Sequence, residues 1–144
     1  MRISQTGIDL IKKWEQFKAD PYKCSAGKWT IGYGHTATAH AGMPKITLKQ
    51  ADELLKSDIA IKEAEVKKHL KGINLSQNQY DAVISFCFNL GVGAFISSNA
   101  YDRMLLDENS KKIADSWITF RNAGGKYLRG LMKRRIDELA LYYK

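Results

Sequence analysis

The residues of this sequence whose types suit catalysis gather between Glu15 and His35. Cys24 follows Glu15 after nine positions, and Thr30 follows Cys24 after six. A carboxyl group can donate or accept a proton, a thiolate can act as a base or a nucleophile, and a hydroxyl can orient a water molecule. The three residues therefore form a candidate acid–base set, provided that the fold brings them together.

The segment before Glu15 is predicted to be a helix that begins near Ser4 or Thr6, because either hydroxyl can cap the first backbone N–H groups. Its apolar stripe has helical spacing and consists of Ile8, Ile11 and Trp14. Glu15 then lies in the last turn, where the negative end of the helix macrodipole disfavours a charged carboxylate. Without the other two residues, a glutamate here would more commonly be an exposed surface residue.

The stretch from Lys18 to Ile46 has no helical period, and glycine and proline divide it into short segments. Tyr22 and the run from Trp29 to Tyr33 have the composition of strands, so we predict a small antiparallel sheet with tight turns. Gly32 and Gly34 alternate along one strand and leave one face without side chains. A ligand or another part of the chain can approach that face closely, although a strained turn would also require glycine.

The rest of the sequence is predicted to be mainly helical. Two capping boxes, Thr47–Gln50 and Ser76–Gln79, each begin a helix. The first helix is expected from Leu48 to Lys71 and is long enough to join two lobes. The second helix runs to Leu90 and is apolar around most of its circumference, so we predict that it is the central buried helix.

The last helix is expected to run from about Leu131 to Tyr143, after a break at Asn122–Gly125. Four side chains are predicted to face inward: Leu131, Ile136, Leu139 and Tyr143. Near the start of the helix, Arg134 or Arg135 is expected either to reach the helix of Glu15 or to remain on a solvated basic face.

The composition is that of a globular domain with an unusual charge. The 144 residues are 44% apolar and 26% charged, with a net charge of +8, and a chain of this length forms one folding unit with a substantial core. Both ends are cationic and the middle is close to neutral. This distribution suits a polyanionic target such as nucleic acid, an anionic membrane or a bacterial envelope, although solubility alone explains it equally well.

No stretch of the sequence has the apolar run of a signal peptide or a membrane span. Cys24 lies in a polar turn and Cys87 in an apolar stretch, so we predict two free thiols in a reducing compartment. The histidines His35, His40 and His69 lack the spacing of metal ligands, and no phosphate-binding glycine motif is present. We therefore expect neither a metal nor a cofactor.

Two features resemble the phage-type lysozymes, a glycoside hydrolase family that includes the endolysins of tailed bacteriophages. They are the spacing of Glu15, Cys24 and Thr30, and the strand TIGYGH that ends in His35. Parts of the C-terminal half also resemble that family: Gln77–Ala82, Phe88–Phe95 and Ala123–Arg135. The resemblance implies an α+β, two-lobed lysozyme fold in a single domain. Residues 16–47 would form a small antiparallel sheet lobe, residues 48–72 a connecting helix, and residues 1–15 with 73–144 a larger helical lobe.

The resemblance also implies a function, that of an endolysin. Such a muramidase hydrolyses the β-1,4 bond between N-acetylmuramic acid and N-acetylglucosamine in bacterial peptidoglycan and thereby lyses the host cell. Glu15 would be the general acid, and Thr30 would orient the attacking water. Cys24 stands where the family more commonly has aspartate, and its thiolate would act as base or nucleophile. The implied substrate-binding residues are Tyr33, Gly34 and His35.

Several alternatives stay open. Asp20 is a rival second carboxylate, although a residue before Pro21 is more commonly part of a turn. His35 at the end of a strand would more often be a structural hydrogen-bonding residue than a ligand for substrate. A lytic transglycosylase would use Glu15 without the other two groups and release 1,6-anhydro products. A basic cell-wall-binding module would show no turnover.

The expected partner is peptidoglycan, bound by a monomer that has no nucleic-acid partner and no integral membrane segment. The protein would remain in the host cytoplasm until the membrane is permeabilised, and would then act on the peptidoglycan of the periplasm. Because no export signal is present, another protein would have to open the membrane.

Overall fold

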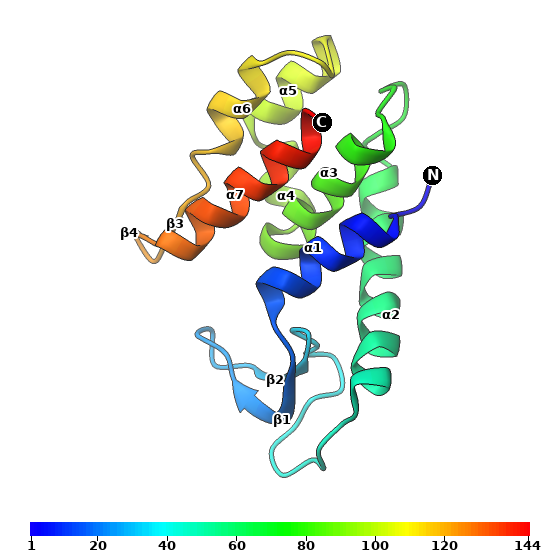
Figure 1. Cartoon of the computed structure of the whole chain (residues 1–144). Helices are drawn as coiled ribbons and strands as arrows, with labels where there is room; N and C mark the ends of the chain where they lie inside the picture. The colour runs from blue at the N-terminus through cyan, green and yellow to red at the C-terminus, as the bar shows by residue number, and fades with distance from the viewer. The chain divides into compact units, whose positions relative to one another are not determined.

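The computed structural model describes all 144 residues and contains seven helices and two short antiparallel sheets (Figure 1). This composition agrees with the predicted α+β class. In chain order the elements are α1 (Gln5–Glu15), β1 (Lys18–Lys23), β2 (Trp29–Gly32), α2 (Leu48–Lys67), α3 (Gln77–Leu90), α4 (Val92–Ile96), α5 (Asn99–Leu106), α6 (Lys112–Trp117), β3 (Asn122–Ala123), β4 (Lys126–Tyr127) and α7 (Arg129–Tyr142).

The chain forms two compact units, Ile11–Ile61 and a larger one that combines Met1–Leu10 with Lys62–Lys144. Their boundaries fall inside α1 and α2. The sequence instead predicts a small lobe of residues 16–47 and a connecting helix of residues 48–72, with boundaries at the ends of helices. A two-stranded sheet cannot bury a core by itself, and the smaller unit accordingly includes parts of both helices. Its buried apolar side chains are Ile11, Ile31, Ala51, Leu55 and Ile59.

The sheet of the smaller unit is the antiparallel pair of β1 and β2, in which Tyr22 is opposite Thr30 and Lys23 is opposite Trp29. The predicted small sheet is therefore confirmed, with two strands. A β-carbon at Gly32 would lie 3.3 Å from the Cβ of Ala51, so β2 packs closely against α2.

Helix α2 begins at the predicted capping box. The Thr47 N–H donates to Gln50 Oε1 (2.8 Å), and the Gln50 N–H donates to Thr47 Oγ1 (3.1 Å). The helix ends at Lys67, one turn before the expected Lys71. It ends early because the following N–H groups donate three residues back, from His69 to the Val66 carbonyl (2.9 Å), which forms turns instead of a helix.

The larger unit is organised around α3, which is buried from Gln79 to Cys87. The capping box of Ser76 and Gln79 is present, and Gly91, with a φ of +90°, ends the helix. Figure 1 shows α3 beside α7, and the ring of Phe86 contacts the rings of Phe95 and Trp117. The prediction of a central buried helix is confirmed.

The side chains that α7 buries differ from those predicted to face inward. Ile136 is 50% exposed, whereas three charged residues, Arg134, Arg135 and Glu138, are buried together with Tyr142. The expectation that the arginines form a solvated basic face is also wrong, and their reach to the helix of Glu15 stays a prediction.

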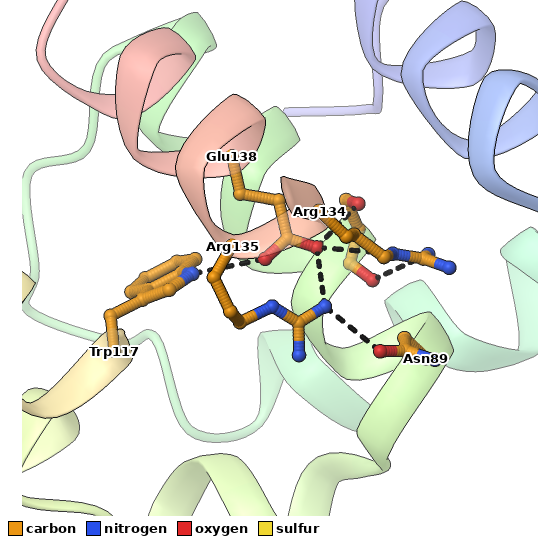
Figure 2. A network of polar contacts seen from close by, with 6 residues as sticks. Asn89, Trp117, Arg134, Arg135 and Glu138 are labelled. Atoms are coloured by element: carbon orange, nitrogen blue, oxygen red, sulfur yellow. Dashed lines mark hydrogen bonds and ion pairs between the residues drawn. The ribbon is translucent and has the colours of Figure 1, made fainter. Parts of the chain in front are cut away.

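The carboxylate of Glu138 explains why α7 buries its charges (Figure 2). Trp117 Nε1 donates to Oε2 (2.9 Å), and three groups donate to Oε1: Ser85 Oγ (2.9 Å), Arg135 Nη2 (2.9 Å) and Arg134 Nε (3.3 Å). Burial lowers the pKa of Arg135, and the charge of Glu138 opposes that shift. A buried charge requires such partners. The contacts of Glu138 therefore determine which face of α7 is buried.

Glu138→Gln should lower the free energy of unfolding by about 3–5 kcal/mol, because two buried arginines would lose their counter-charge. Urea unfolding at neutral pH measures this loss. The matched control is Glu53→Gln on the exposed face of α2, which should change stability by no more than about 0.5 kcal/mol. Equal stability of the two variants would contradict the assigned role of Glu138.

Candidate active site

Glu15 is the last residue of α1 because the chain turns sharply at Gln16. Gln16 has a φ of +59° and donates its N–H to the carbonyl of Lys12 (3.0 Å), an arrangement that commonly ends helices. The partly exposed side chain of Glu15 lies against Gly34, where a β-carbon would be 2.9 Å from Glu15 Oε2. Because Gly34 has no side chain, the carboxyl group of Glu15 can occupy the space beside its backbone.

Gly34 belongs to a tight turn after β2. Ile31 and His35 exchange two backbone hydrogen bonds of 2.9 Å, and Gly34 between them has a φ of +81°, which glycine adopts without strain. The sequence predicted a bare face that a ligand or the chain itself can approach. In the structure, the chain approaches both glycines, since Gly32 faces Ala51 and Gly34 faces Glu15.

Gly34→Ala should displace the carboxyl group of Glu15, since the new methyl group would occupy its position. We expect activity to fall by about 10²-fold, the effect of a misplacement of roughly 1 Å at a reacting group. Gly42→Ala is the matched control, because Gly42 also has a positive φ (+74°), but a methyl group added there would have no atom within 4 Å. Equal rates of peptidoglycan cleavage by the two variants would show that only backbone strain matters.

Cys24 begins the turn between β1 and β2. Its backbone N–H donates to the Lys28 carbonyl (2.9 Å), and its own carbonyl accepts from the Gly27 N–H (2.8 Å). The side chain is partly exposed. Hydrogen bonds from the backbone N–H groups of Lys28 and Ala26 lower the pKa of the Cys24 thiol, and the Thr30 hydroxyl adds to the effect. The turn thus stabilises a thiolate at Cys24.

Iodoacetamide should alkylate Cys24 with a pH midpoint below the ordinary thiol value of about 8.5, because the folded turn favours the thiolate. Unfolding in urea should return the midpoint to the ordinary value, so at pH 7 the folded protein reacts faster. In the Cys24→Ala control, the remaining thiol of Cys87 should stay unreactive until the protein unfolds, since burial raises its pKa. A folded midpoint at or above the ordinary value would contradict this description of the turn.

Thr30 is buried, with 3% of its surface exposed. Its hydroxyl lies 3.0 Å from the Lys28 carbonyl oxygen and also within hydrogen-bonding reach of the Cys24 sulfur. A hydroxyl has one proton to donate and two lone pairs to accept with. It can therefore serve one of these acceptors while accepting a bond from a water molecule.

Tyr33 and His35 differ in their accessibility to a ligand. Tyr33 is partly exposed, its ring centroid is 5.8 Å from that of Phe17, and Lys12 Nζ lies 5.5 Å from its ring. His35 is 5% exposed, and both of its ring nitrogens contact other side chains. Its Nδ1 is 2.8 Å from Asp58 Oδ2.

The second ring nitrogen of His35, Nε2, lies 2.8 Å from Thr38 Oγ1 and accepts from the Thr38 N–H (3.3 Å). Nδ1 therefore carries the proton and donates to Asp58. These contacts tie the glycine turn to α2, and they favour the structural alternative for His35 over contact with substrate. The sequence was not used to assign a role to Asp58. Its position could have been noticed, because it is an acidic residue three positions after Leu55, which α2 buries.

Tyr22 is another residue that the analysis of the sequence did not assign to the site. It is opposite Thr30 in the strand pair. Burial is the main cause that raises the pKa of Tyr22, and the charges of Glu15 and Cys24 raise it further. Thr30 belongs to β2, Cys24 begins the turn after β1, and Glu15 lies against the turn that follows β2; all three belong to the unit Ile11–Ile61.

A carboxyl, a thiol and a hydroxyl group on one unit can supply the acid and the base of a hydrolytic reaction. The family model described as phage lysozyme matches residues 12–138. An endolysin from Acyrthosiphon pisum secondary endosymbiont phage 1 is 39% identical, with 99% of this chain and 98% of that protein aligned. The endolysin of Bacillus phage PZA is 38% identical over 99% of this chain, which spans only 55% of that protein.

A solved structure, the muramidase domain of SpmX from Asticaccaulis excentricus, superposes with a TM-score of 0.89 at 33% identity and covers 99% of this chain and 98% of its own. The chain therefore belongs to the phage lysozyme family, and the predicted lysozyme fold is confirmed. No helix combines the length and the apolar character needed to cross a membrane.

Proposed function

We propose that the protein is an endolysin that hydrolyses the β-1,4 bond between N-acetylmuramic acid and N-acetylglucosamine in bacterial peptidoglycan. Membership of the phage lysozyme family makes it a glycoside hydrolase. The observation that supports the site best is the position of Glu15 at the end of α1, against Gly34 and close to the β1–β2 pair that carries Cys24 and Thr30.

Glu15 is the general acid of the proposed reaction. It gives its proton to the glycosidic oxygen as the bond from the anomeric carbon to that oxygen breaks, and the electron pair of the bond stays with the leaving oxygen. The bare backbone of Gly34 leaves room for the carboxyl group, because no side chain competes for the space. His35 holds that turn through Asp58, so we assign His35 a positioning role.

Cys24 and Thr30 act on the other side of the scissile bond. As a base, the Cys24 thiolate takes a proton from a water molecule that Thr30 orients, and the water oxygen bonds to the anomeric carbon. As a nucleophile, the sulfur bonds to that carbon first; water then displaces it as the thiolate, and the deprotonated Glu15 takes up the proton of that water. The turn that lowers the pKa of Cys24 favours the thiolate that either route requires.

Substrate contact on this unit is assigned to the backbone at Gly34, which is partly exposed beside Glu15, and to the partly exposed Tyr33 that precedes it in the chain. The protein acts as a monomer in this proposal. It remains in the host cytoplasm until the membrane is permeabilised and then reaches the peptidoglycan of the periplasm.

A turbidity assay tests the proposed function. Purified protein should clear a suspension of cells whose outer membrane has been permeabilised, and should release soluble saccharides from purified peptidoglycan. Failure to release saccharides at any pH between 5 and 9 would refute the proposal and favour a binding module.

A further inference from the structure

The side chain of Tyr22 occupies a defined place among the reacting groups. Directly paired residues of two strands point to the same face of the sheet, so Tyr22 shares a face with Thr30. Cys24 follows β1 and begins the turn, where its N–H donates to the Lys28 carbonyl (2.9 Å), and the Thr30 hydroxyl lies within hydrogen-bonding reach of its sulfur. Lys23 and Trp29 take the opposite face, with Lys23 Nζ 5.6 Å from the Trp29 ring.

The phenol of Tyr22 is protonated at neutral pH. The pKa of an ordinary tyrosine is about 10, and burial, followed by the charges of Glu15 and Cys24, raises the pKa of Tyr22 further. A protonated phenol is a hydrogen-bond donor, so it can donate to an oxygen of a bound ligand.

Tyr22 is also accessible to a ligand. It is partly exposed and lines an open groove of about 600 Å³ along β1, together with Phe17, Lys18, Ala19, Asp20 and Pro21. The groove itself contains none of the three predicted reacting residues, but the pairing of Tyr22 with Thr30 places Tyr22 beside them. A sugar bound beside Thr30 and Cys24 can therefore reach the partly exposed side chain of Tyr22.

We propose that Tyr22 is a further substrate-contacting residue, whose phenol donates a hydrogen bond to an oxygen of the sugar bound between Glu15 and Cys24. This inference rests on the proposed muramidase function. A neutral hydrogen bond of this kind corresponds to a change of about 3–10-fold in affinity or rate.

The first test measures binding without turnover. The affinity for the trimer of N-acetylglucosamine is measured by NMR titration in the inactive Glu15→Gln background, with and without Tyr22→Phe. Removal of the hydroxyl should weaken binding by about 3–10-fold. Tyr127→Phe is the matched control, because Tyr127 is 56% exposed on β4, and it should leave the affinity unchanged. Equal affinity with and without the Tyr22 hydroxyl would overturn the inference.

The second test measures turnover. It shows whether the Tyr22 hydroxyl contacts substrate even if the trimer does not bind. Tyr22→Phe should lower kcat/KM on soluble peptidoglycan fragments by the same factor, while the pH midpoint for alkylation of Cys24 stays at the wild-type value. A shifted midpoint would show that Tyr22 acts through the thiol and would overturn the substrate contact. Wild-type rates in Tyr22→Phe would refute this inference alone, whereas an inactive wild-type protein would refute the proposed function.

Discussion

Glu15→Gln should abolish lysis and leave the fold intact. The amide has nearly the shape of the carboxyl group but cannot donate a proton to the leaving oxygen, and loss of a general acid costs about 10²–10⁴-fold in rate. The measurement is the initial rate of saccharide release from purified peptidoglycan, with circular dichroism to confirm the fold. A variant that retains more than roughly a tenth of the wild-type rate would contradict the assignment of the acid.

Asp20→Asn is the matched control for that experiment. Asp20 is exposed, and Lys45 Nζ lies 3.8 Å from its Oδ2, so its loss should change activity and stability little. An inactive Asp20→Asn enzyme would move the second catalytic group from Cys24 to Asp20.

Cys24 separates the possible mechanisms better than any other residue. Cys24→Ala should lose about 10²–10⁴-fold in rate, because no base or nucleophile would remain on that side of the bond. Cys24→Asp should remain active, since a carboxylate can replace the thiolate in either role, and should no longer be inactivated by iodoacetamide. Rates of saccharide release with and without the reagent measure both effects.

Cys87 provides the control for the thiol reagent. It is a buried free thiol of α3, so Cys87→Ala should be inactivated by iodoacetamide as fast as the wild type. A fully active Cys24→Ala enzyme would rule out a mechanism that uses Cys24. It would favour a lytic transglycosylase, which needs Glu15 alone.

Features that depend on neighbouring residues could be predicted from the sequence. The capping box at Thr47 needs only Gln50, three positions away, and the end of α3 needs only Gly91. The same holds for α1 and for the antiparallel pair of β1 and β2. The site residues Glu15, Cys24 and Thr30 could be proposed because their spacing is also local, within sixteen positions.

Features that depend on distant partners could not be predicted. Glu138 receives a hydrogen bond from Ser85, 53 positions away, and without that partner a pattern of apolar residues wrongly placed Ile136 inside. The break at Asn122–Gly125 was expected, but not the pairing of Asn122 with Tyr127 across it. A structural hydrogen bond of His35 could be expected from the sequence, but its partner Asp58, 23 positions later in another element, could not.

The central claim is that this site delivers water to the anomeric carbon of N-acetylmuramic acid. Digestion of purified peptidoglycan in water enriched in oxygen-18, followed by immediate borohydride reduction and mass spectrometry, tests it most directly, with Glu15→Gln as the blank. The proposed mechanism predicts one oxygen-18 atom at the reducing end of each released N-acetylmuramic acid. An unlabelled 1,6-anhydro product would show that the sugar's own hydroxyl attacks, and would contradict hydrolysis at this site.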